Sequence, residues 1–366
     1  MKYLVISDVH LGHKKTKTEY ILSNLEDYLT KDLLKDVDVL FIAGDFFDRL
    51  LSLQSNEAYL IISYIRSLFK LLHTTGTMLR VLMGTPSHDW RQNELFNSIY
   101  ACVNDKYPVN FRYIDNLYLE DILGYKVLYI PDEYKPTADL VYKDVKELLD
   151  SKMLKKVDLI IMHGMFSFQI PTAVKSPLIH DEAKYLSICK YYIHPGHIHE
   201  RKTFDRIYAQ GSFDRLMHND ESPKGGYLCE IGDKLVEPIF VENKKAKKYI
   251  TINVSHKTTD EIISRLSKLY AKLDSGSYIR LKTNIDSDAV VYFKKLQKRF
   301  TDFELSLKVV NNKEAKEVQQ QTYTPIAITR DNIAELLKNI YGKRENIDTT
   351  DIPKIDKFLE EILNEL

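Results

Sequence analysis

The sequence lacks the features that mark membrane proteins and disulfide-stabilised proteins. Three cysteines occur in 366 residues, far apart and with no C-x-x-C pair: Cys102, Cys189 and Cys229. This spacing argues against both a disulfide framework and a structural zinc site. No apolar run approaches the ~20 residues that span a bilayer, and the amino terminus leads directly into a strand pattern rather than a signal peptide. A cytoplasmic protein without membrane contact is therefore expected.

An excess of charge of one sign is also missing, because 52 basic residues balance 52 acidic residues. A nucleic-acid-binding domain usually carries a basic stripe, so any such surface in this chain must be local. Three short basic clusters are candidates: Lys14–Lys17, Lys244–Lys248 and Lys294–Arg299. The first lies beside the first of the motifs described next, whereas the second reads equally well as an interdomain linker.

The sequence does contain apolar runs that repeatedly lead into clusters of Asp and His. The five clusters are Asp8-Val9-His10, Gly44-Asp45, Ser87-His88-Asp89, His163-Gly164 and Gly196-His197-Ile198-His199. They follow Tyr3–Ile6, Val39–Ala43, Met78–Met83, Leu159–Met162 and Tyr191–Ile193. Such runs are typical of strands buried in an α/β sheet, and ligands bind beyond the carboxyl ends of these strands. The clusters are therefore expected to converge on one pocket.

Asp and His together indicate a site for manganese, iron or zinc rather than for calcium or magnesium. Two such metals bridged by a carboxylate form the usual machinery for hydrolysing phosphate esters. Asp45 can bridge because a carboxylate has two oxygens, each able to bind its own metal.

The five clusters resemble the calcineurin-like metallophosphoesterase superfamily, whose pattern is D-x-H, GD, GN-H-D, a single His and GH-x-H. Gly44–Asp48 is similar to the GD-x-x-D form of the DNA-repair nucleases in this group. Gln210–Leu216 and Lys224–Tyr227 resemble the segment that follows the site in SbcD-type nuclease subunits. The resemblance implies an α/β fold, a four-layer sandwich of two mixed β-sheets flanked by helices, with a small α+β capping domain and C-terminal helices.

The resemblance also implies a role for each matching residue. One metal would be held by Asp8, His10, Asp45 and His199. The second would share Asp45 and add His163 and His197. His88 would contact the scissile phosphate and help the leaving oxygen to depart, and Asp48 is placed with it in the catalytic group. Asp48 and Asp89 are candidates for fixing the free ring nitrogens of the ligating histidines, although both read equally well as turn carboxylates.

The chain departs from the family pattern at the second metal. The family has an Asn ligand before the catalytic His, but this chain reads Gly84-Thr85-Pro86-Ser87-His88-Asp89, with two extra residues and Ser87 in the Asn position. Ser87 is accordingly assigned as a ligand. Because a hydroxyl is a weaker donor than an amide carbonyl, a water could complete the site, or a re-routed loop could supply another oxygen. Asp132 and Glu133 also follow an apolar run, but the resemblance gives them no role.

Pattern breaks divide the chain into three predicted domains. Residues 1–243 form the nuclease domain, in which Asn56–Leu72 is a helix that packs on the sheet and is implied to contribute to a homodimer contact. Strands over 207–209, 227–231 and 235–241 are expected to extend the second sheet as antiparallel additions. Residues 244–310 read as a β-α-β-α-β unit that corresponds to a DNA-end-binding capping domain. Residues 311–366 form a linker and terminal helices.

The last helix carries an apolar stripe that must be buried against something. Its residues are Ile355, Phe358, Leu359, Ile362 and Leu363. Docking on its own domain is one possibility, and docking on a partner's helices is the other. The resemblance favours the partner, an SMC-like ATPase subunit of the SbcC type.

The leading hypothesis is a manganese-dependent DNA nuclease with two divalent metal ions. It would act as a 3′–5′ exonuclease and a single-strand or hairpin endonuclease within an ATPase-coupled repair or recombination complex. Lys14, Lys15, Lys17 and Arg91 are the predicted DNA contacts. The alternatives are a small-molecule phosphodiesterase or phosphatase of the same superfamily, and a weakly catalytic subunit that tethers DNA ends.

Overall fold

The computed structural model describes residues 1–310 except 53, 219, 234–235 and 274. Residues Met1–Val309 form one unit by their internal contacts. The apolar stripe at 355–363 lies outside the described residues, so its partner stays a prediction, as do the three domain boundaries. In the part of the chain that is described, no helix combines the length and apolarity needed to cross a membrane.

The first sheet has six strands in the order β14-β13-β1-β2-β3-β4. Its strands are β1 (Lys2–Ile6), β2 (Val39–Ala43), β3 (Met78–Leu82), β4 (Phe111–Ile114), β13 (Gly225–Glu230) and β14 (Val236–Glu242). The neighbours from β1 to β4 run parallel, as expected for strands joined by helical crossovers. The carboxyl ends of β1, β2 and β3 therefore lie at one edge of the sheet.

The second sheet also has six strands, in the order β11-β12-β10-β7-β6-β5. They are β5 (Tyr118–Ile122), β6 (Tyr125–Ile130), β7 (Val157–His163), β10 (Cys189–Gly196), β11 (Lys202–Phe204) and β12 (Ile207–Ala209). Strand β7 is parallel to both β6 and β10. The carboxyl ends of these three strands therefore share an edge as well.

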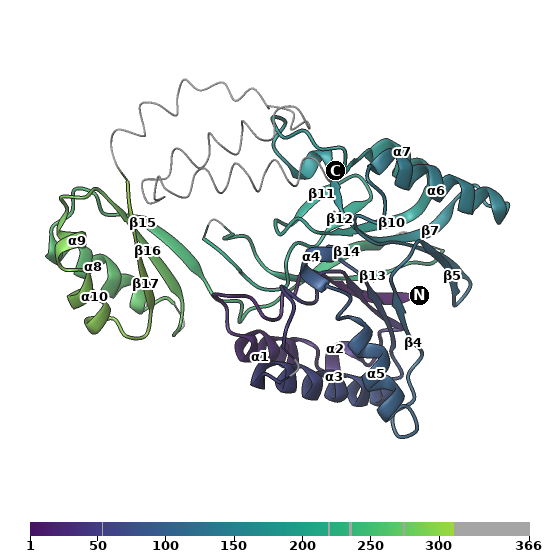
Figure 1. The fold of residues 1–366 in the computed structure, drawn as a ribbon, viewed down its shortest axis with the longest axis horizontal. Coiled ribbons are helices and arrows are strands. Elements are labelled where there is room, and N and C mark those ends of the chain that lie inside the picture. Colours follow the sequence, from purple (N-terminus) through teal and green to yellow (C-terminus); the bar gives the residue numbers. More distant parts are fainter. Residues whose placement is uncertain (53, 219, 234–235, 274, 311–366) are drawn as a thin grey trace, which may run out of the picture. The chain divides into compact units, whose positions relative to one another are not determined.

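The two sheets pack face to face and helices cover their outer faces. The core between the sheets includes Tyr3 and Phe41 of the first sheet and Tyr129 and Ile161 of the second, all fully or almost fully buried. Helices α1 (Thr18–Tyr28), α2 (Lys31–Leu34), α3 (Asn56–Thr75) and α5 (Glu94–Val103) cover the first sheet, and α6 (Ala138–Ser151) and α7 (Glu182–Ile188) cover the second (Figure 1). The predicted α/β sandwich with helices on both sides is confirmed.

Helix α3 shows how local sequence sets an element's limits. Ser55 accepts a hydrogen bond from the Ala58 amide at the start of the helix, and Gly76 ends it in the left-handed region at φ 73°. The face that includes Ile61, Ile65 and Leu68 is buried against the first sheet. The short elements α4 (Pro86–Asp89), β8 (Met165–Phe166) and β9 (Ile179–His180) complete this part of the chain.

The segment after residue 248 forms a small parallel sheet of β15 (Tyr249–Asn253), β16 (Tyr278–Thr283) and β17 (Glu304–Val309). Helices α8 (Thr259–Tyr270), α9 (Asp288–Val291) and α10 (Phe293–Arg299) pack on one face of this sheet around Ile279, Leu281 and Leu305. The β-α-β-α-β pattern expected from the sequence is present, with the second helix divided into α9 and α10.

One expectation about the sheets is wrong. Strands β13 and β14 extend the first sheet, not the second, because β13 pairs antiparallel with β1 through partners such as Tyr3 and Cys229. Of the three expected strands only β12 joins the second sheet, and it pairs parallel with β10 rather than antiparallel, with β11 antiparallel beside it. Short turns between apolar runs indicate strands, but they do not identify the sheet edge that supplies the hydrogen-bonding partner.

His194 is buried between the sheets as a neutral imidazole and predicts a pH-dependent stability. Its Nδ1 lies 3.1 Å from the carbonyl of Tyr208, and its Nε2 lies 2.9 Å from the hydroxyl of Tyr3. Burial lowers the pKa of His194 to about 3 from a usual 6.5. Between these values the unfolded chain binds a proton that the folded chain excludes. The free energy of unfolding should therefore fall by roughly 1.4 kcal/mol per pH unit as pH drops from 6.5 toward 3.

His194→Gln should remove that component, which can be measured by urea denaturation between pH 7 and pH 4. The exposed His256 offers the control substitution His256→Gln. Parallel pH profiles for the wild type and His194→Gln would contradict this account.

Candidate metal centre

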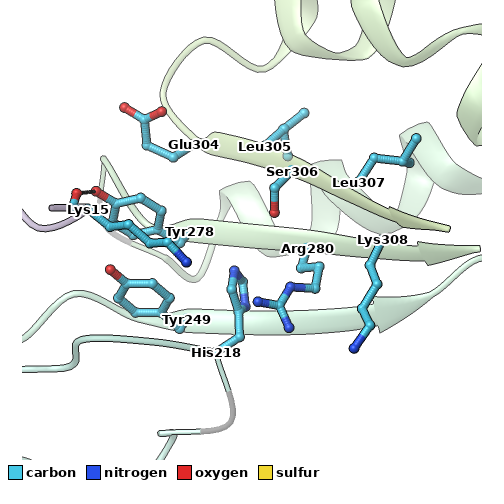
Figure 2. Close-up of a pocket in the computed structure, with 10 residues that line it drawn as sticks. All are labelled: Lys15, His218, Tyr249, Tyr278, Arg280, Glu304, Leu305, Ser306, Leu307 and Lys308. Atoms are coloured by element: carbon cyan, nitrogen blue, oxygen red, sulfur yellow. Dashed lines mark hydrogen bonds between the residues drawn. The ribbon is translucent and has the colours of Figure 1, made fainter. Parts of the chain in front are cut away.

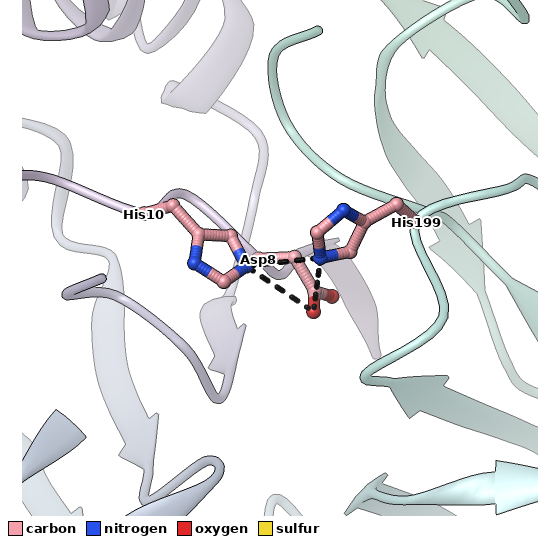
Figure 3. A group of neighbouring side chains, drawn as sticks. All are labelled: Asp8, His10 and His199. Atoms are coloured by element: carbon pink, nitrogen blue, oxygen red, sulfur yellow. Dashed lines mark hydrogen bonds and ion pairs between the residues drawn. The ribbon is translucent and has the colours of Figure 1, made fainter. Parts of the chain in front are cut away.

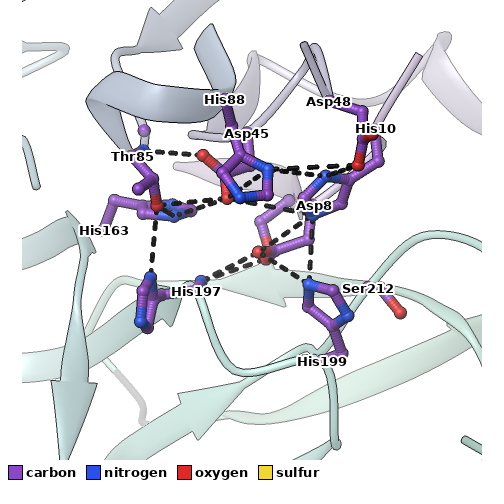
Figure 4. A network of polar contacts seen from close by, with 12 residues as sticks. Asp8, His10, Asp45, Asp48, Thr85, His88, His163, His197, His199 and Ser212 are labelled. Atoms are coloured by element: carbon purple, nitrogen blue, oxygen red, sulfur yellow. Dashed lines mark hydrogen bonds and ion pairs between the residues drawn. The ribbon is translucent and has the colours of Figure 1, made fainter. Parts of the chain in front are cut away.

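The predicted ligands meet where the carboxyl ends of strands from both sheets face each other. Asp8 and His10 follow β1, and Asp45 follows β2. His163 ends β7, and His197 and His199 follow β10 (Figure 4). The two layers of the sandwich thus each contribute to one cluster, and three overlapping groups within it are able to hold a metal ion.

The first group consists of Asp8, His10 and His199 (Figure 3). The Nε2 atoms of His10 and His199 lie 3.0 Å apart, and Oδ1 of Asp8 lies 3.9 Å from each of them. Two ring nitrogens bound to one ion at about 2.1 Å and at right angles would lie about 3 Å apart. The donor set therefore fits a divalent cation.

The second group consists of Asp45, His163 and His197. Oδ2 of Asp45 lies 3.3 Å from Nε2 of His163, and the same oxygen lies 3.8 Å from Nε2 of His10. Asp45 therefore lies between the two groups, which is the position that a bridging carboxylate requires.

His88 lies at the rim of the cluster, on α4. Its Nδ1 lies 4.0 Å from Oδ2 of Asp45 and 3.2 Å from Nδ1 of His10, and 36% of its side chain is exposed. This exposure contrasts with His10 and His163, which are buried. An imidazole placed in this way can reach a substrate that contacts the centre from solvent.

The backbone is strained where it presents these side chains. Asp8, His10, Asp45 and His197 all have positive φ, at 51°, 55°, 49° and 94°. Such conformations cost non-glycine residues roughly 1–3 kcal/mol each, and they gather here just after the ends of β1, β2 and β10. The turns direct consecutive polar side chains toward one point, and the packed sandwich maintains them.

Glycines in the motifs allow the two sheets to approach. A Cβ atom on Gly44 would lie 2.1 Å from Nδ1 of His163, and one on Gly84 would lie 2.1 Å from the backbone nitrogen of Asp45. No side chain fits at those distances, so the Gly-Asp and Gly-Thr sequences have a steric cause. They let the loops after β2 and β3 contact each other and His163.

Hydrogen bonds fix the orientation of two ligating rings. Nδ1 of His163 donates to the carbonyl of Ala43 at 2.7 Å, which leaves Nε2 toward Asp45. Nδ1 of His10 lies 3.1 Å from Oδ1 of Asp48, which leaves Nε2 toward Asp8 and His199. Asp48 thus has the supporting position expected for it, because an acceptor on the outer ring nitrogen sets the tautomer of a metal-binding histidine.

The charges of the cluster shift its pKa values in opposite directions. Burial alone would raise the pKa of Asp45, but the neighbouring His163 and His10 hold that pKa well below its usual range. Burial raises the pKa of Asp8. Burial also opposes a charge on His163, yet Asp45 and Asp8 outweigh it and raise the pKa. The carboxylates and imidazoles therefore offset each other's buried charge by sharing protons. A divalent cation would displace these protons on binding.

Ser87 does not lie among the ligands as expected. It is exposed on α4, and no described residue hydrogen-bonds its hydroxyl. Thr85 lies in the cluster instead, with Oγ1 3.3 Å from Oδ2 of Asp45 and 3.4 Å from Nε2 of His163. The two extra residues are part of the first turn of α4. The residue directly before His88, Ser87, therefore lies on the helix, and the hydroxyl in the cluster belongs to Thr85.

Asp89 supports the loops rather than a histidine. Its carboxylate accepts hydrogen bonds from the backbone amides of Phe47 and Gly84 and from the side chain of Asn93, at 3.1, 2.7 and 2.7 Å. It therefore joins the loop after β2 to the loop after β3.

Asp132 is the polar residue at this edge to which the sequence assigned no role. It follows β6 and is 6% exposed, with Oδ2 3.3 Å from Nδ1 of His197. The signal was present, because an apolar run precedes it as one precedes the other clusters.

The predicted DNA contacts are all at the surface. Lys14, Lys15, Lys17 and Arg91 are exposed, the three lysines in the loop after His10 and Arg91 just after α4. Lys15 also lines a cavity beside the small parallel sheet. No ligand tests their role, so these four assignments stay predictions.

Asp48→Ala should weaken metal binding by 10–100-fold, because it leaves the outer nitrogen of His10 without its acceptor. Asp48→Asn retains an acceptor oxygen and should weaken binding less. Calorimetric titration with Mn²⁺ measures both effects, and Asp139→Ala, at a carboxylate that is 84% exposed, is the control. Equal affinity in Asp48→Ala and wild type would contradict a supporting role for Asp48.

Comparison with known proteins agrees with this geometry. The calcineurin-like phosphoesterase family matches residues 1–271. A search of curated proteins found no match. The crystal structure of TT1561 of Thermus thermophilus is similar at 13% identity and a TM-score of 0.37, over 62% of this chain and 93% of that one. A second crystal structure is similar at 14% identity and a TM-score of 0.36, over 62% of this chain and 94% of that one. The family match covers most of the sequence, and the chain belongs to the calcineurin-like phosphoesterases, a family of metal-dependent phosphoester hydrolases.

Proposed function

We propose that this protein is a manganese-dependent DNA nuclease that hydrolyses phosphodiester bonds. The observation that carries the proposal is the pair of donor groups joined at Asp45, with the half-exposed His88 at their rim. The mixture of carboxylate and imidazole donors favours manganese among the common divalent ions.

The residues of the chain have separate tasks in this reaction. Asp8, His10 and His199 would hold one metal ion, Asp45 with His163 and His197 would hold the other, and Asp45 would be shared. When bound, such a pair neutralises phosphate charge and lowers the pKa of a water molecule toward neutrality. His88 would contact the phosphate from the solvent side and supply a proton to the leaving oxygen.

A cationic cavity favours a polyanionic substrate over a small one. It has a volume of about 520 Å³ and is lined by three cations (Lys15, Arg280 and Lys308) and one carboxylate (Glu304), together with His218 and neighbouring residues of the small sheet (Figure 2). None of the three cations forms an ion pair with a carboxylate of the described residues. Unpaired basic groups that converge in this way are typical of phosphate contacts, which supply affinity without sequence information.

The cavity is linked to the metal centre through shared residues. His218 lines it, and His218 also lines a second cavity of about 390 Å³ together with His199 and the carboxylate residues Glu200, Asp220 and Glu221. Lys15 belongs to the loop that follows His10, and the backbone carbonyl of Lys15 accepts a hydrogen bond from Tyr278 of the small sheet. A strand whose scissile phosphate lies at the metals would pass His218 and these carboxylates before it reaches the cationic cavity, so the cationic cavity itself would supply the phosphate contacts.

The partners of the nuclease belong to the same proposal. A homodimer contact through the helical layer of α3 and its neighbours would follow the pattern of the enzymes that the sequence resembles. The apolar stripe at 355–363 would bind an SMC-like ATPase subunit. Repair or recombination at DNA ends, with 3′–5′ polarity and hairpin opening, is the corresponding activity in the cytoplasm.

Purified protein with Mn²⁺ should degrade linear and hairpin DNA in a gel assay, and His88→Ala should lower the rate by 10²–10⁴-fold because a general acid is removed. Circular dichroism should show the same fold for the variant. Hydrolysis of a chromogenic phosphodiester without any cleavage of DNA would indicate a small-molecule enzyme. Binding of DNA without cleavage would indicate a tethering subunit.

Arg280→Ala should raise the KM for a single-stranded oligonucleotide and leave hydrolysis of bis(p-nitrophenyl) phosphate unchanged. The salt dependence of binding should also flatten by about 0.7 in the log–log slope for each phosphate that the protein no longer neutralises. Lys155→Ala is the control, because Lys155 is exposed, does not line the cavity and belongs to none of the three basic clusters. Equal oligonucleotide kinetics for Arg280→Ala and Lys155→Ala would remove the support that the cavity gives to a DNA substrate.

A further inference from the structure

Four possible metal-binding atoms surround the hydroxyl of Thr85. Oγ1 of Thr85 lies 3.1 Å from Oδ2 of Asp132, 3.3 Å from Oδ2 of Asp45, 3.4 Å from Nε2 of His163 and 3.3 Å from Nδ1 of His197. Three of these atoms belong to the second donor group, and the fourth belongs to Asp132. Figure 4 shows Thr85 beside Asp45, His163 and His197, and the Asp132 oxygen contacts the same hydroxyl.

The fold places Asp132 at this point. Strand β6 is parallel to β7, with Ile130 opposite Met162, so the residues that follow Ile130 emerge beside His163. Oδ1 of Asp132 accepts a hydrogen bond from the backbone amide of Glu133 at 3.0 Å, and Glu133 has a left-handed φ of 47°. This turn leaves Oδ2 facing Thr85 and His197.

The contact between Asp132 and His197 differs from an ordinary supporting contact. A supporting carboxylate normally binds the ring nitrogen that does not face the metal, as Asp48 does for His10. For His197, Asp132 and Thr85 both approach Nδ1, at 3.3 Å each. Asp132 is therefore on the same side of the ring as the second donor group.

We infer that Asp132 is a ligand of the second divalent cation, where the resembling enzymes use an amide oxygen. The inference deepens the proposed function, since it rests on the metal pair proposed there. The side chain of Ser87 is exposed, and the hydroxyl of Thr85 is a weak metal ligand. The side chains of the loop after β3 therefore supply no strong oxygen ligand for the metal. Asp132 supplies that oxygen from the adjacent sheet. Thr85 donates hydrogen bonds to both carboxylates, from its backbone amide to Asp45 and from its hydroxyl to Asp132, and so fixes their orientation.

This ligand changes the charge of the site. With the shared Asp45 and Asp132, two carboxylates and two imidazoles would surround the second ion, and Asp8, Asp45 and Asp132 together would oppose the charge of the two ions with three negative charges. Two carboxylate ligands shift the metal preference of the site toward hard ions that favour oxygen ligands, such as manganese. An amide in the same position would leave the set with one negative charge.

Metal stoichiometry tests this inference separately from nuclease activity. After equilibrium dialysis against Mn²⁺, wild type should retain two ions per chain. Asp132→Ala should retain one at the same free Mn²⁺ concentration, with the second bound at least 10-fold more weakly. The electron paramagnetic resonance spectrum should change accordingly, from an exchange-coupled pair to a single ion. Asp132→Asn should retain more of the second ion than Asp132→Ala, because an amide oxygen remains.

Glu133→Ala and Ser87→Ala are the matched controls and should each retain two ions. Two ions bound with wild-type affinity in Asp132→Ala would overturn the inference. If that variant does not fold, anomalous scattering from manganese-soaked wild-type crystals decides the question. The expected result is an Asp132 oxygen at about 2.2 Å from the second ion, and an oxygen more than about 4 Å away would overturn it. If the wild-type protein retains no Mn²⁺ after dialysis, the metal centre itself is wrong. If the wild-type protein binds two ions but does not cleave DNA, only the nuclease function is wrong.

Discussion

The whole arrangement depends on one constraint: carboxylates and imidazoles from two sheets must remain close together in a buried place. Asp8, Asp45 and His163 are almost completely buried, with Asp45 3.3 Å from His163 and both carboxylates within 3.9 Å of Nε2 of His10. Burying charged groups without compensation costs several kcal/mol per ion. The pKa shifts of Asp45 and His163 show that these groups compensate through each other. A divalent cation is the stronger compensation, since it attracts both the carboxylates and the neutral imidazoles.

The sandwich supplies the rigidity that this crowding requires. Tyr3, Phe41 and Tyr129 fill the space between the sheets, and the strands that carry the ligands are the central ones. Backbone strain at Asp8, His10 and Asp45 is tolerated because the strands before them cannot shift to relieve it. Gly44 and Gly84 also keep the site compact, because their lack of a side chain lets the loops after β2 and β3 contact each other.

Much of this could be predicted from the sequence, because a buried strand and its polar end leave a direct signal. Val39–Ala43 is found as predicted, and Met78–Leu82 differs from its prediction by one residue. What the sequence did not indicate concerns partners that are distant along the chain. The pairing of β13 with β1 depends on which sheet edge is open, and apolar alternation carries no information about that. The position of Ser87 was misjudged because two extra residues became part of a helix rather than part of the loop.

The case of Asp132 shows where a family pattern and a physical pattern differ. A family pattern assigns roles by motif, and it gives this residue none. The physical rule is that polar groups just after parallel strands meet at one edge, and it treats Ile130-Pro131-Asp132 like the other clusters. The two rules disagree at the position where the family's Asn is missing. A ligand that is missing from one strand end can be replaced from the neighbouring sheet, because both sheets present their carboxyl ends to the same ions. The replacement is anionic, so in this chain the fold around the second ion should depend more strongly on the cation than an amide-containing site would.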